Sequence, residues 1–186
     1  LSKKIIGQVL FAKIEYGSFL PKWRPAQDYR NTVSARSELG GGVLFELSHE
    51  IDYANCFFGP FKTIQSIQRN TNSLEINTED IVDMILTNYQ EESISIHLDF
   101  CTRISRRTCS VFGSKSSLHL DLIKNSIKYL GENRETCLLG SSRLGPDMYR
   151  NQLIHFIDCI ERNVKPLVTL EDSIEVLKVH FPTMNI

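Results

Sequence analysis

The middle of the chain, residues 61–130, is a succession of short segments with the two-residue period of β-strands. The clearest is segment 93–100, in which isoleucine, leucine and phenylalanine alternate with serine, histidine and aspartate. A polar connection joins it to the β-rich segment 80–89, as in an antiparallel hairpin. Further strands are predicted over residues 10–16, 61–68, 106–112, 118–122 and 126–130. Strands that follow one another without intervening helices favour a largely antiparallel sheet.

Two stretches on either side of this run have the spacing of amphipathic helices. The first covers residues 44–58 and ends at the strong stop signal Gly59-Pro60. The second begins near Pro146, after residues 131–146, whose polar and glycine-rich composition predicts a long mobile loop. Its apolar stripe consists of Tyr149, Leu153, Phe156, Ile157 and Ile160.

A third helix opens at Thr169, with Asp172 placed for a capping box, and ends at Phe181-Pro182. Ile174 and Leu177 are predicted to form its inner face. The predicted fold is therefore α+β: an open-faced, largely antiparallel sheet with helices packed on one face. The uncovered face must meet water, a second domain or a partner chain.

Composition excludes several classes of protein. The chain has 186 residues and a net charge of −1, which suits one large domain or two small ones and argues against a dedicated nucleic-acid binder. No apolar run is long enough to cross a membrane, and the N-terminus lacks the pattern of a signal peptide. The five cysteines are odd in number and contain no Cys-x-x-Cys pair. They are interpreted as buried thiols in a reducing cytoplasm, without a disulfide or zinc site.

The densest group of chemically active side chains is Glu46, Ser48, His49, Glu50 and Asp52. On one continuous helix, His49 lies three residues from both Glu46 and Asp52 and could neighbour both carboxylates. A histidine beside a carboxylate suits general acid–base catalysis. The alternative is a helix start with favourable acids and a histidine in a structural hydrogen bond. The preceding glycines, residues 40–42, would let a ligand approach the backbone closely.

A second group, Trp23, Arg24, Tyr29 and Arg30, lies in an irregular loop rich in proline and glycine. Arginine forks bind carboxylates or phosphates, and tryptophan packs on sugar faces, so these residues are candidates for substrate binding. A surface loop anchored by one aromatic residue explains them equally well. Arg103, Arg106 and Arg107 near strand ends are interpreted as solvated charges.

Negative findings limit the chemistry. The chain has no Gly-x-Gly-x-x-Gly after a strand, no phosphate-binding Walker loop and no Gly-x-Ser-x-Gly. Position 53 is tyrosine, so His49-Glu50 does not begin the His-Glu-x-x-His motif of zinc proteases. No nucleotide-cofactor site is visible in the chain.

Segment 37–53, with its Gly-Gly-Gly and His-x-x-Asp elements, and Gly59 after it resemble the family of glucose–fructose oxidoreductases, inositol dehydrogenases and rhizopine-catabolism proteins. Trp23-Arg24-Pro25 and Asp28-Tyr29-Arg30 resemble the branch that acts on sugars or nucleotide-linked sugars. Segment 111–115 and the helix over 149–163 follow the family's order. The resemblance covers nearly the whole chain, but only the C-terminal domain of the family.

The resemblance implies that residues 1–186 are a single domain for substrate binding and oligomerisation, from which the family's N-terminal Rossmann domain is absent. NAD or NADP would be bound by that other domain, and none is expected in this chain. The family's Glu-Lys-Pro triplet is also missing, since Val164 precedes Lys165-Pro166. A homo-oligomer formed through the open sheet face, a cytoplasmic location and no activity of the chain alone are expected.

By the same resemblance, His49 matches the histidine that exchanges the hydroxyl proton while hydride moves. The family often carries aspartate four residues earlier, where this chain has Phe45. The acid before His49 is here Glu46, three residues earlier, which is the second candidate catalytic residue. Asp52 matches a supporting position and is also a candidate for substrate binding. Two alternatives remain open: a non-catalytic dimerisation or binding module, and a metal-dependent sugar enzyme that uses His49, Glu46 and Asp52.

Overall fold

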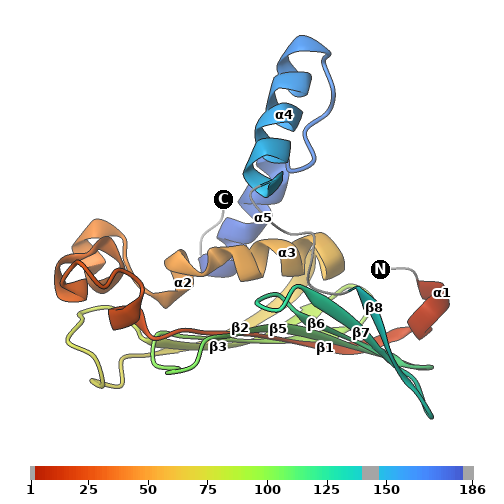
Figure 1. Ribbon diagram of the computed structural model, residues 1–186, viewed down its shortest axis with the longest axis horizontal. Helices are drawn as coiled ribbons and strands as arrows, with labels where there is room; N and C mark the ends of the chain where they lie inside the picture. Colours follow the sequence, from red (N-terminus) through yellow and green to blue (C-terminus); the bar gives the residue numbers. More distant parts are fainter. Residues whose placement is uncertain (1–2, 140–146, 182–186) are drawn as a thin grey trace.

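A single twisted sheet organises the computed structural model, which describes residues 3–139 and 147–181 (Figure 1). The sheet has eight strands in the described residues, in the order β2-β3-β4-β1-β5-β6-β7-β8. β1 pairs with β4 in parallel, and all the other pairs are antiparallel. The strands are β1 (Val9–Gly17), β2 (Phe61–Arg69), β3 (Ile81–Asn88), β4 (Ser93–Asp99), β5 (Arg106–Gly113), β6 (Ser117–Asp121), β7 (Ser126–Leu130) and β8 (Glu135–Leu139).

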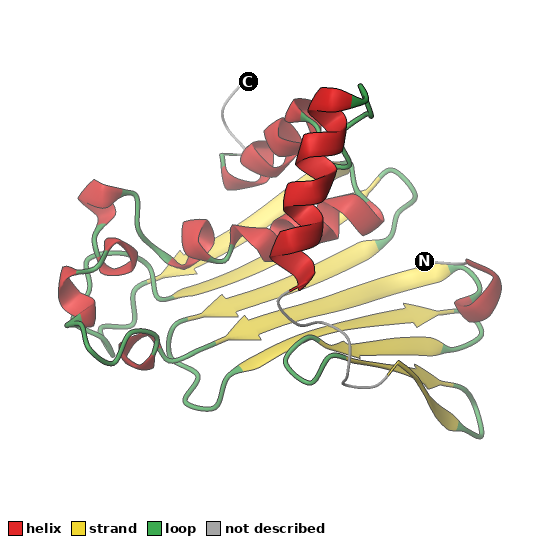
Figure 2. Cartoon of the chain, turned by 45° about the horizontal axis from the view of Figure 1, so that its top comes forward, coloured by secondary structure: helices red, strands yellow, loops and turns green. Residues whose placement is uncertain are grey.

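The main helices lie on one face of this sheet, and the opposite face carries none in the described part of the chain (Figures 1 and 2). α3 crosses above the strands, α5 packs on α3, and α4 projects away from the sheet. The predicted α+β class with an open-faced sheet is confirmed. The helices are α1 (Lys3–Ile6), α2 (Val43–Glu46), α3 (Ser48–Phe58), α4 (Asp147–Glu161) and α5 (Leu170–His180), and the loop after β1 contains the short 3-10 turns η1 (Leu20–Lys22), η2 (Tyr29–Asn31), η3 (Val33–Ala35) and η4 (Ser37–Leu39).

The core lies between α3 and the central strands. Ile51, Ala54 and Phe58 of α3 are buried at the three- and four-residue spacing of one helix face. They pack against alternate residues of the strands, of which Ile14 and Ile96 are examples. The two-residue and 3.6-residue periods of the sequence meet in this layer, so both predictions are borne out here.

The structure corrects two of the predicted elements. The single helix predicted over residues 44–58 is divided at Leu47, whose backbone leaves the helical region at φ −105° and ψ 21°. Leu47 is itself buried, so the inner face of the two helices continues across the break. Part of the loop predicted over residues 131–146 is the edge strand β8, which pairs with β7. Residues 140–146, including Pro146, lie outside the described residues.

The C-terminal helices differ from their predicted packing. α5 begins with the expected capping box between Thr169 and Asp172. However, Val176 and Val179 face the core, whereas Leu177 is exposed and Ile174 is half-buried. The apolar stripe of α4 is exposed along its length.

No helix in the described ranges is long and apolar enough to cross a membrane. The five cysteines form no disulfide in the described structure. Only Cys109 of them is buried there, so the interpretation of all five as buried thiols is wrong.

Candidate active site around His49

The glycine run before α2 makes room for the chain itself. Gly42 has a φ of +118°, which favours glycine, and a side chain there would collide with the carboxylate of Glu79. That carboxylate accepts a hydrogen bond from the backbone N–H of Leu44, at 2.9 Å, and so caps the start of α2. The predicted close approach to the backbone is therefore made by an internal side chain.

A buried ion pair lies beneath the start of α3. The Glu50 side chain is completely buried, and its Oε1 accepts hydrogen bonds from Arg107 Nε at 2.7 Å and pairs with Arg107 Nη2 at 2.6 Å. His49 Nε2 lies 3.2 Å from the same oxygen. The imidazole remains 43% exposed, so it lies at the surface end of a buried charge pair.

Tyr16 of β1 completes the group. Its ring centroid is 5.6 Å from that of His49, and the Arg107 guanidinium carbon lies 5.1 Å from the Tyr16 ring centroid. Cation–π attraction favours this placement of Arg107. The His49 site is therefore built by β1, α3 and β5, which are distant in sequence. We use this name below for Tyr16, His49, Glu50 and Arg107.

The environment changes the proton affinities of these groups. Burial and the nearby Arg107 charge lower the pKa of His49 to about 4, so its ring is neutral at pH 7. Burial raises the pKa of Glu50, and Arg107 opposes that rise. Burial also raises the pKa of Tyr16 and raises the pKa of Cys109 to about 12. A neutral imidazole has one ring nitrogen able to accept a proton.

The hydrogen bonding of the Glu50 carboxyl group is incomplete. Its second oxygen, Oε2, is buried and has no hydrogen-bond partner in the described structure, and the same is true of the Tyr53 hydroxyl. Tyr53 is three residues beyond Glu50 on α3 and so shares its face. Burial and the Glu50 charge raise the pKa of Tyr53 well above its ordinary value, which keeps the phenol neutral.

The two acids predicted beside His49 have different positions. The break at Leu47 puts Glu46 at the end of α2, where its Oε1 accepts a hydrogen bond from Ser34 Oγ at 2.9 Å. Asp52 remains on α3 and lines the same cavity as His49. The carboxylate nearest to His49 is instead that of Glu50, a member of the predicted cluster for which the sequence indicates no role of its own.

Arg107 corrects the prediction of a solvated charge. Its sequence signal was present, because Arg107 is in phase with the buried residues Cys109 and Val111 on the helix-facing side of β5. A charged residue on the inner face of a strand requires a buried partner of opposite charge. The partner, Glu50, is 57 residues earlier in the chain, and only the fold brings the two together.

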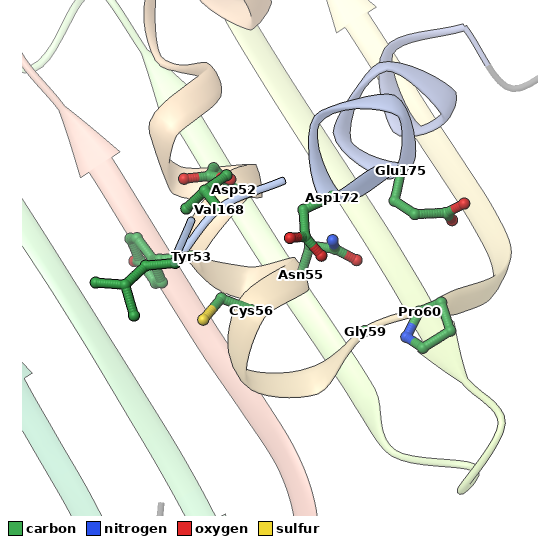
Figure 3. Close-up of a pocket in the computed structure, with 10 residues that line it drawn as sticks. Asp52, Tyr53, Asn55, Cys56, Gly59, Pro60, Val168, Asp172 and Glu175 are labelled. Atoms are coloured by element: carbon green, nitrogen blue, oxygen red, sulfur yellow. The ribbon is translucent and has the colours of Figure 1, made fainter. Parts of the chain in front are cut away.

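Two adjoining cavities lie between α3 and α5. One has a volume of about 470 Å³ and is lined by His49, Asp52 and residues of α5. The other, of about 590 Å³, shares Asp52 and Val168 with it (Figure 3). The second cavity contains three carboxylates and no lysine or arginine: its lining is Asp52, Tyr53, Asn55, Cys56, Gly59, Pro60, Leu167, Val168, Asp172 and Glu175.

The loop cluster lies apart from this site. Trp23 packs edge-on against Phe100 and donates its Nε1 hydrogen to Ser18 Oγ at 2.9 Å, so it anchors the loop. Arg30 pairs with Asp28 and Glu75, and the Tyr29 hydroxyl accepts a hydrogen bond from the backbone N–H of Glu75. No hydrogen bond, ion pair or ring contact of the described residues joins Trp23, Arg24, Tyr29 or Arg30 to His49.

The described residues do not fit a metal or a dinucleotide. No group of three or more histidine, cysteine, aspartate or glutamate side chains is placed to hold a metal ion in residues 3–139 and 147–181. The metal-dependent alternative therefore lacks a site in this region. A dinucleotide fold needs parallel strands with crossover helices and a glycine-rich turn, whereas this sheet is almost entirely antiparallel.

The family model for the GFO/IDH/MocA C-terminal domain matches residues 1–119, which carry β1–β5 and the whole His49 site. The chain belongs to this family. No curated protein matches its sequence.

Solved structures share the fold of this GFO/IDH/MocA C-terminal domain. Aldose-aldose oxidoreductase from Caulobacter crescentus is 16% identical with a TM-score of 0.78, and the match covers 97% of our chain and 53% of that chain. UDP-N-acetylglucosamine 3-dehydrogenase from Acidithiobacillus ferrooxidans is 11% identical, with a TM-score of 0.74 and coverage of 97% and 54%.

Biliverdin reductase from Synechocystis, in complex with biliverdin and NADP+, is similar to the same degree, at 16% identity, a TM-score of 0.73 and coverage of 96% and 55%. At these identities the likeness concerns the fold alone. The chain spans about half the length of these solved structures.

Proposed function

We propose that the chain is the substrate-binding and oligomerisation domain of an NAD(P)-dependent oxidoreductase that transfers hydride to or from a sugar or nucleotide-linked sugar. The observation that carries the proposal is His49, a neutral and accessible imidazole at the edge of a cavity in a chain of this family. His49 accepts the proton of a substrate hydroxyl during oxidation and returns it during reduction. NAD(P) would be bound by another domain, and no step of its chemistry is assigned to residues of this chain.

The charge of the cavities supports a substrate rich in hydroxyl groups. Carboxylate oxygens are acceptors only, so Asp52 can take hydrogen bonds from sugar hydroxyls. An anionic group would be repelled by three carboxylates with no cation among the lining residues. Asp52 is therefore assigned to substrate binding, and Glu46 to support of the α2 end beside His49.

The loop cluster is assigned to a more distant part of the substrate. Arg24 lines a depression of about 690 Å³ and has no ion pair in the described structure, unlike Arg30. An unpaired guanidinium suits the phosphates of a nucleotide-linked sugar. Arg24→Ala should weaken binding of UDP-N-acetylglucosamine without changing that of a simple aldose. Equal effects on both ligands would contradict this assignment.

We also propose that residues 1–186 are one domain and that a separate Rossmann domain covers α4. Tyr149, Leu153, Phe156 and Ile160 form an exposed apolar stripe of the kind that marks a contact surface. The solved relatives are almost twice as long as the matched region. Cysteines without disulfides support a reducing compartment, the cytoplasm.

The open sheet face is the proposed surface of a homo-oligomer. It exposes Ile67 and Ile85 together with the stacked rings of Phe11 and Phe112, whose centroids are 4.3 Å apart. Sedimentation over a range of concentrations should show a dimer or larger assembly. Ile85→Lys should dissociate it, whereas Ile104→Lys, in an exposed loop, should not. A monomeric wild-type chain at all concentrations would contradict the proposal.

The enzymatic role is tested in the longer protein that includes the dinucleotide domain. His49→Ala should lower kcat by about 10²–10⁴-fold and change KM much less, as expected for a general base. The 186-residue chain alone should give no saturable fluorescence change with NADH or NADPH. A saturable response would contradict the proposal that a separate domain binds NAD(P).

The alternative of a non-catalytic binding module predicts a different outcome. The DNA upstream of the region that encodes Leu1 would then contain no in-frame Gly-x-Gly-x-x-Gly or Glu-Lys-Pro. If the intact enzyme with His49→Ala were fully active, the protein would still be an oxidoreductase, but His49 would not be one of its catalytic residues.

A further inference from the structure

The imidazole of His49 has two ring nitrogens, and which of them carries the proton decides which one can act as a base. His49 Nε2 lies 3.2 Å from Glu50 Oε1. A lone pair on Nε2 would be repelled by that carboxylate oxygen, whereas an Nε2–H would be attracted to it. The contact therefore favours the tautomer with the proton on Nε2 and the lone pair on Nδ1.

Glu50 can impose this choice because its carboxyl group is held in place beside a guanidinium. Its side chain is completely buried, and two Arg107 nitrogens hold Oε1 at 2.6 and 2.7 Å. Distances of this kind are typical of a charge-assisted contact with a carboxylate. Arg107 is held in turn by the Tyr16 ring, against which His49 also packs.

We propose that Glu50, held by Arg107, is a positioning residue that keeps the proton of His49 on Nε2 and leaves Nδ1 as the proton acceptor. The proposal rests on the function proposed above for His49 and adds a residue that positions the proton of its ring. Glu50 touches neither substrate nor cofactor and acts only through the imidazole. Arg107 has a double effect, because it fixes Glu50 and also disfavours a second proton on His49.

The elements around His49 each contribute a titratable or charged group, either next to the ring or in the lining of the cavity beside it. β1 supplies a phenol, β5 a guanidinium, α3 two carboxylates and α5 a second imidazole across the cavity. They are Tyr16, Arg107, Glu50, Asp52 and His180. Among the carboxylates of the described structure, that of Glu50 is the one with an oxygen within 4.0 Å of a His49 ring nitrogen.

The first test is the tautomer of His49 in the 186-residue chain. Long-range ¹H–¹⁵N correlation spectra at pH 7 distinguish the two tautomers, and His49→Gln assigns the signals. Wild-type chain should show the Nε2–H form, and Glu50→Gln should reduce its excess over the Nδ1–H form about tenfold. Glu46→Gln is the matched control and should leave the ratio unchanged. The proposal would be overturned if the tautomer ratio changed in Glu46→Gln and not in Glu50→Gln, or if it changed in neither variant.

The second test is the NMR titration of His49 in three variants. Arg107→Gln leaves the Glu50 charge uncompensated, so the pKa of His49 should rise most. Glu50→Gln leaves Arg107 uncompensated, so the pKa should stay at or below the wild-type value. Glu50→Gln combined with Arg107→Gln removes both charges and should bring the pKa to an intermediate position. If the pKa of His49 shifted in the same direction in all three variants, Glu50 and Arg107 would form a merely structural pair and the proposal would be overturned.

The double variant also serves if a single variant fails to fold, because it leaves no unpaired charge beside α3. These spectra need neither cofactor nor substrate. A Glu50-dependent tautomer together with a fully active His49→Ala enzyme would retain the positioning role and refute the catalytic one. An inactive His49→Ala enzyme whose wild-type tautomer is insensitive to Glu50 would do the reverse.

Discussion

α3 and α4 have similar amphipathic sequences but very different surroundings. α3 buries Ile51, Ala54 and Phe58 against the sheet. α4 leaves Leu153, Phe156 and Ile160 exposed at 59%, 61% and 67%. The period of apolar residues determines that each segment is an amphipathic helix, but it does not determine what the apolar face contacts.

The comparison extends to charge. α3 carries Glu50 on its inner face, where the sheet supplies Arg107 as a partner. The ion pairs of α4 and α5 are at the surface, as between Asp158 and Arg162. Removing contacts from α3 should therefore reduce the stability of the chain far more than removing contacts from α4.

The largest effect is expected from the charge beneath α3. Arg107→Met leaves Glu50 buried without its partner and should destabilise the chain by about 3–5 kcal/mol. Urea unfolding measures the loss. The control Arg106→Met breaks only the exposed contact with Glu15, at 3.4 Å, and should cost about 1 kcal/mol or less. If both variants lost the same amount of stability, the buried Glu50–Arg107 pair would contribute no more than an exposed ion pair.

The apolar face of α3 should come next. Ile51 is fully buried, so Ile51→Ala removes packed methyl groups and should cost about 2–5 kcal/mol. Thermal and urea unfolding provide the measurement. A loss below about 1 kcal/mol would mean that α3 is no better packed than α4.

α5 lies between the buried α3 and the exposed α4 in the structure (Figure 1). A change at the start of α5 should therefore have an intermediate effect on stability. Thr169 accepts a hydrogen bond from the Asp172 backbone N–H, and the Asp172 carboxylate accepts one from that of Thr169. Thr169→Ala should cost about 1 kcal/mol. Thr169→Asn, which keeps a capping oxygen, should lose much less. A neutral Thr169→Ala would indicate that the start of α5 is frayed in solution.

A pH-dependent effect of about the same size is expected from the outer side of α3. The folded chain lowers the pKa of His49 to about 4, so the unfolded chain binds this proton more tightly. The resulting stability is complete above pH about 6.5 and is lost as the pH falls toward 4. Because the side chain is 43% exposed, solvent screening limits the loss to about 1 kcal/mol. His49→Asn should flatten the stability profile in this window, and an unchanged profile would contradict the shift.

The smallest effect should be on α4. Phe156→Ala removes a large but exposed side chain and should change the stability of this chain by about 0.5 kcal/mol or less. The same substitution in the longer protein should cost more if another domain covers the stripe. A loss above about 2 kcal/mol in the 186-residue chain would show that α4 is already packed, and the comparison with α3 would fail.

Much of this structure was predictable because its signals are local. Alternation identified most strands, Gly59-Pro60 marked the end of α3, and Thr169 with Asp172 marked the start of α5. β8 was missed because its five residues, Glu-Thr-Cys-Leu-Leu, do not alternate between polar and apolar, and its pairing depends on the neighbouring β7. The break at Leu47 was missed because the apolar spacing runs on without interruption from Leu44 to Ile51 and so gives no signal of a change in the backbone.

For the site, the sequence by itself identified His49 as a candidate general acid–base in an acidic cluster. It also led to the wrong interpretation of Arg107 as a solvated charge, although Arg107 is in phase with Cys109 and Val111 on its strand. Only the tertiary structure decided that Glu50, and not Glu46, is the carboxylate nearest to the ring, and that Arg107 is its partner. The physical reason is that a carboxylate changes its role when it is buried. Burial is set by strands and helices that lie far apart in the sequence, and no periodicity within a single segment can report it.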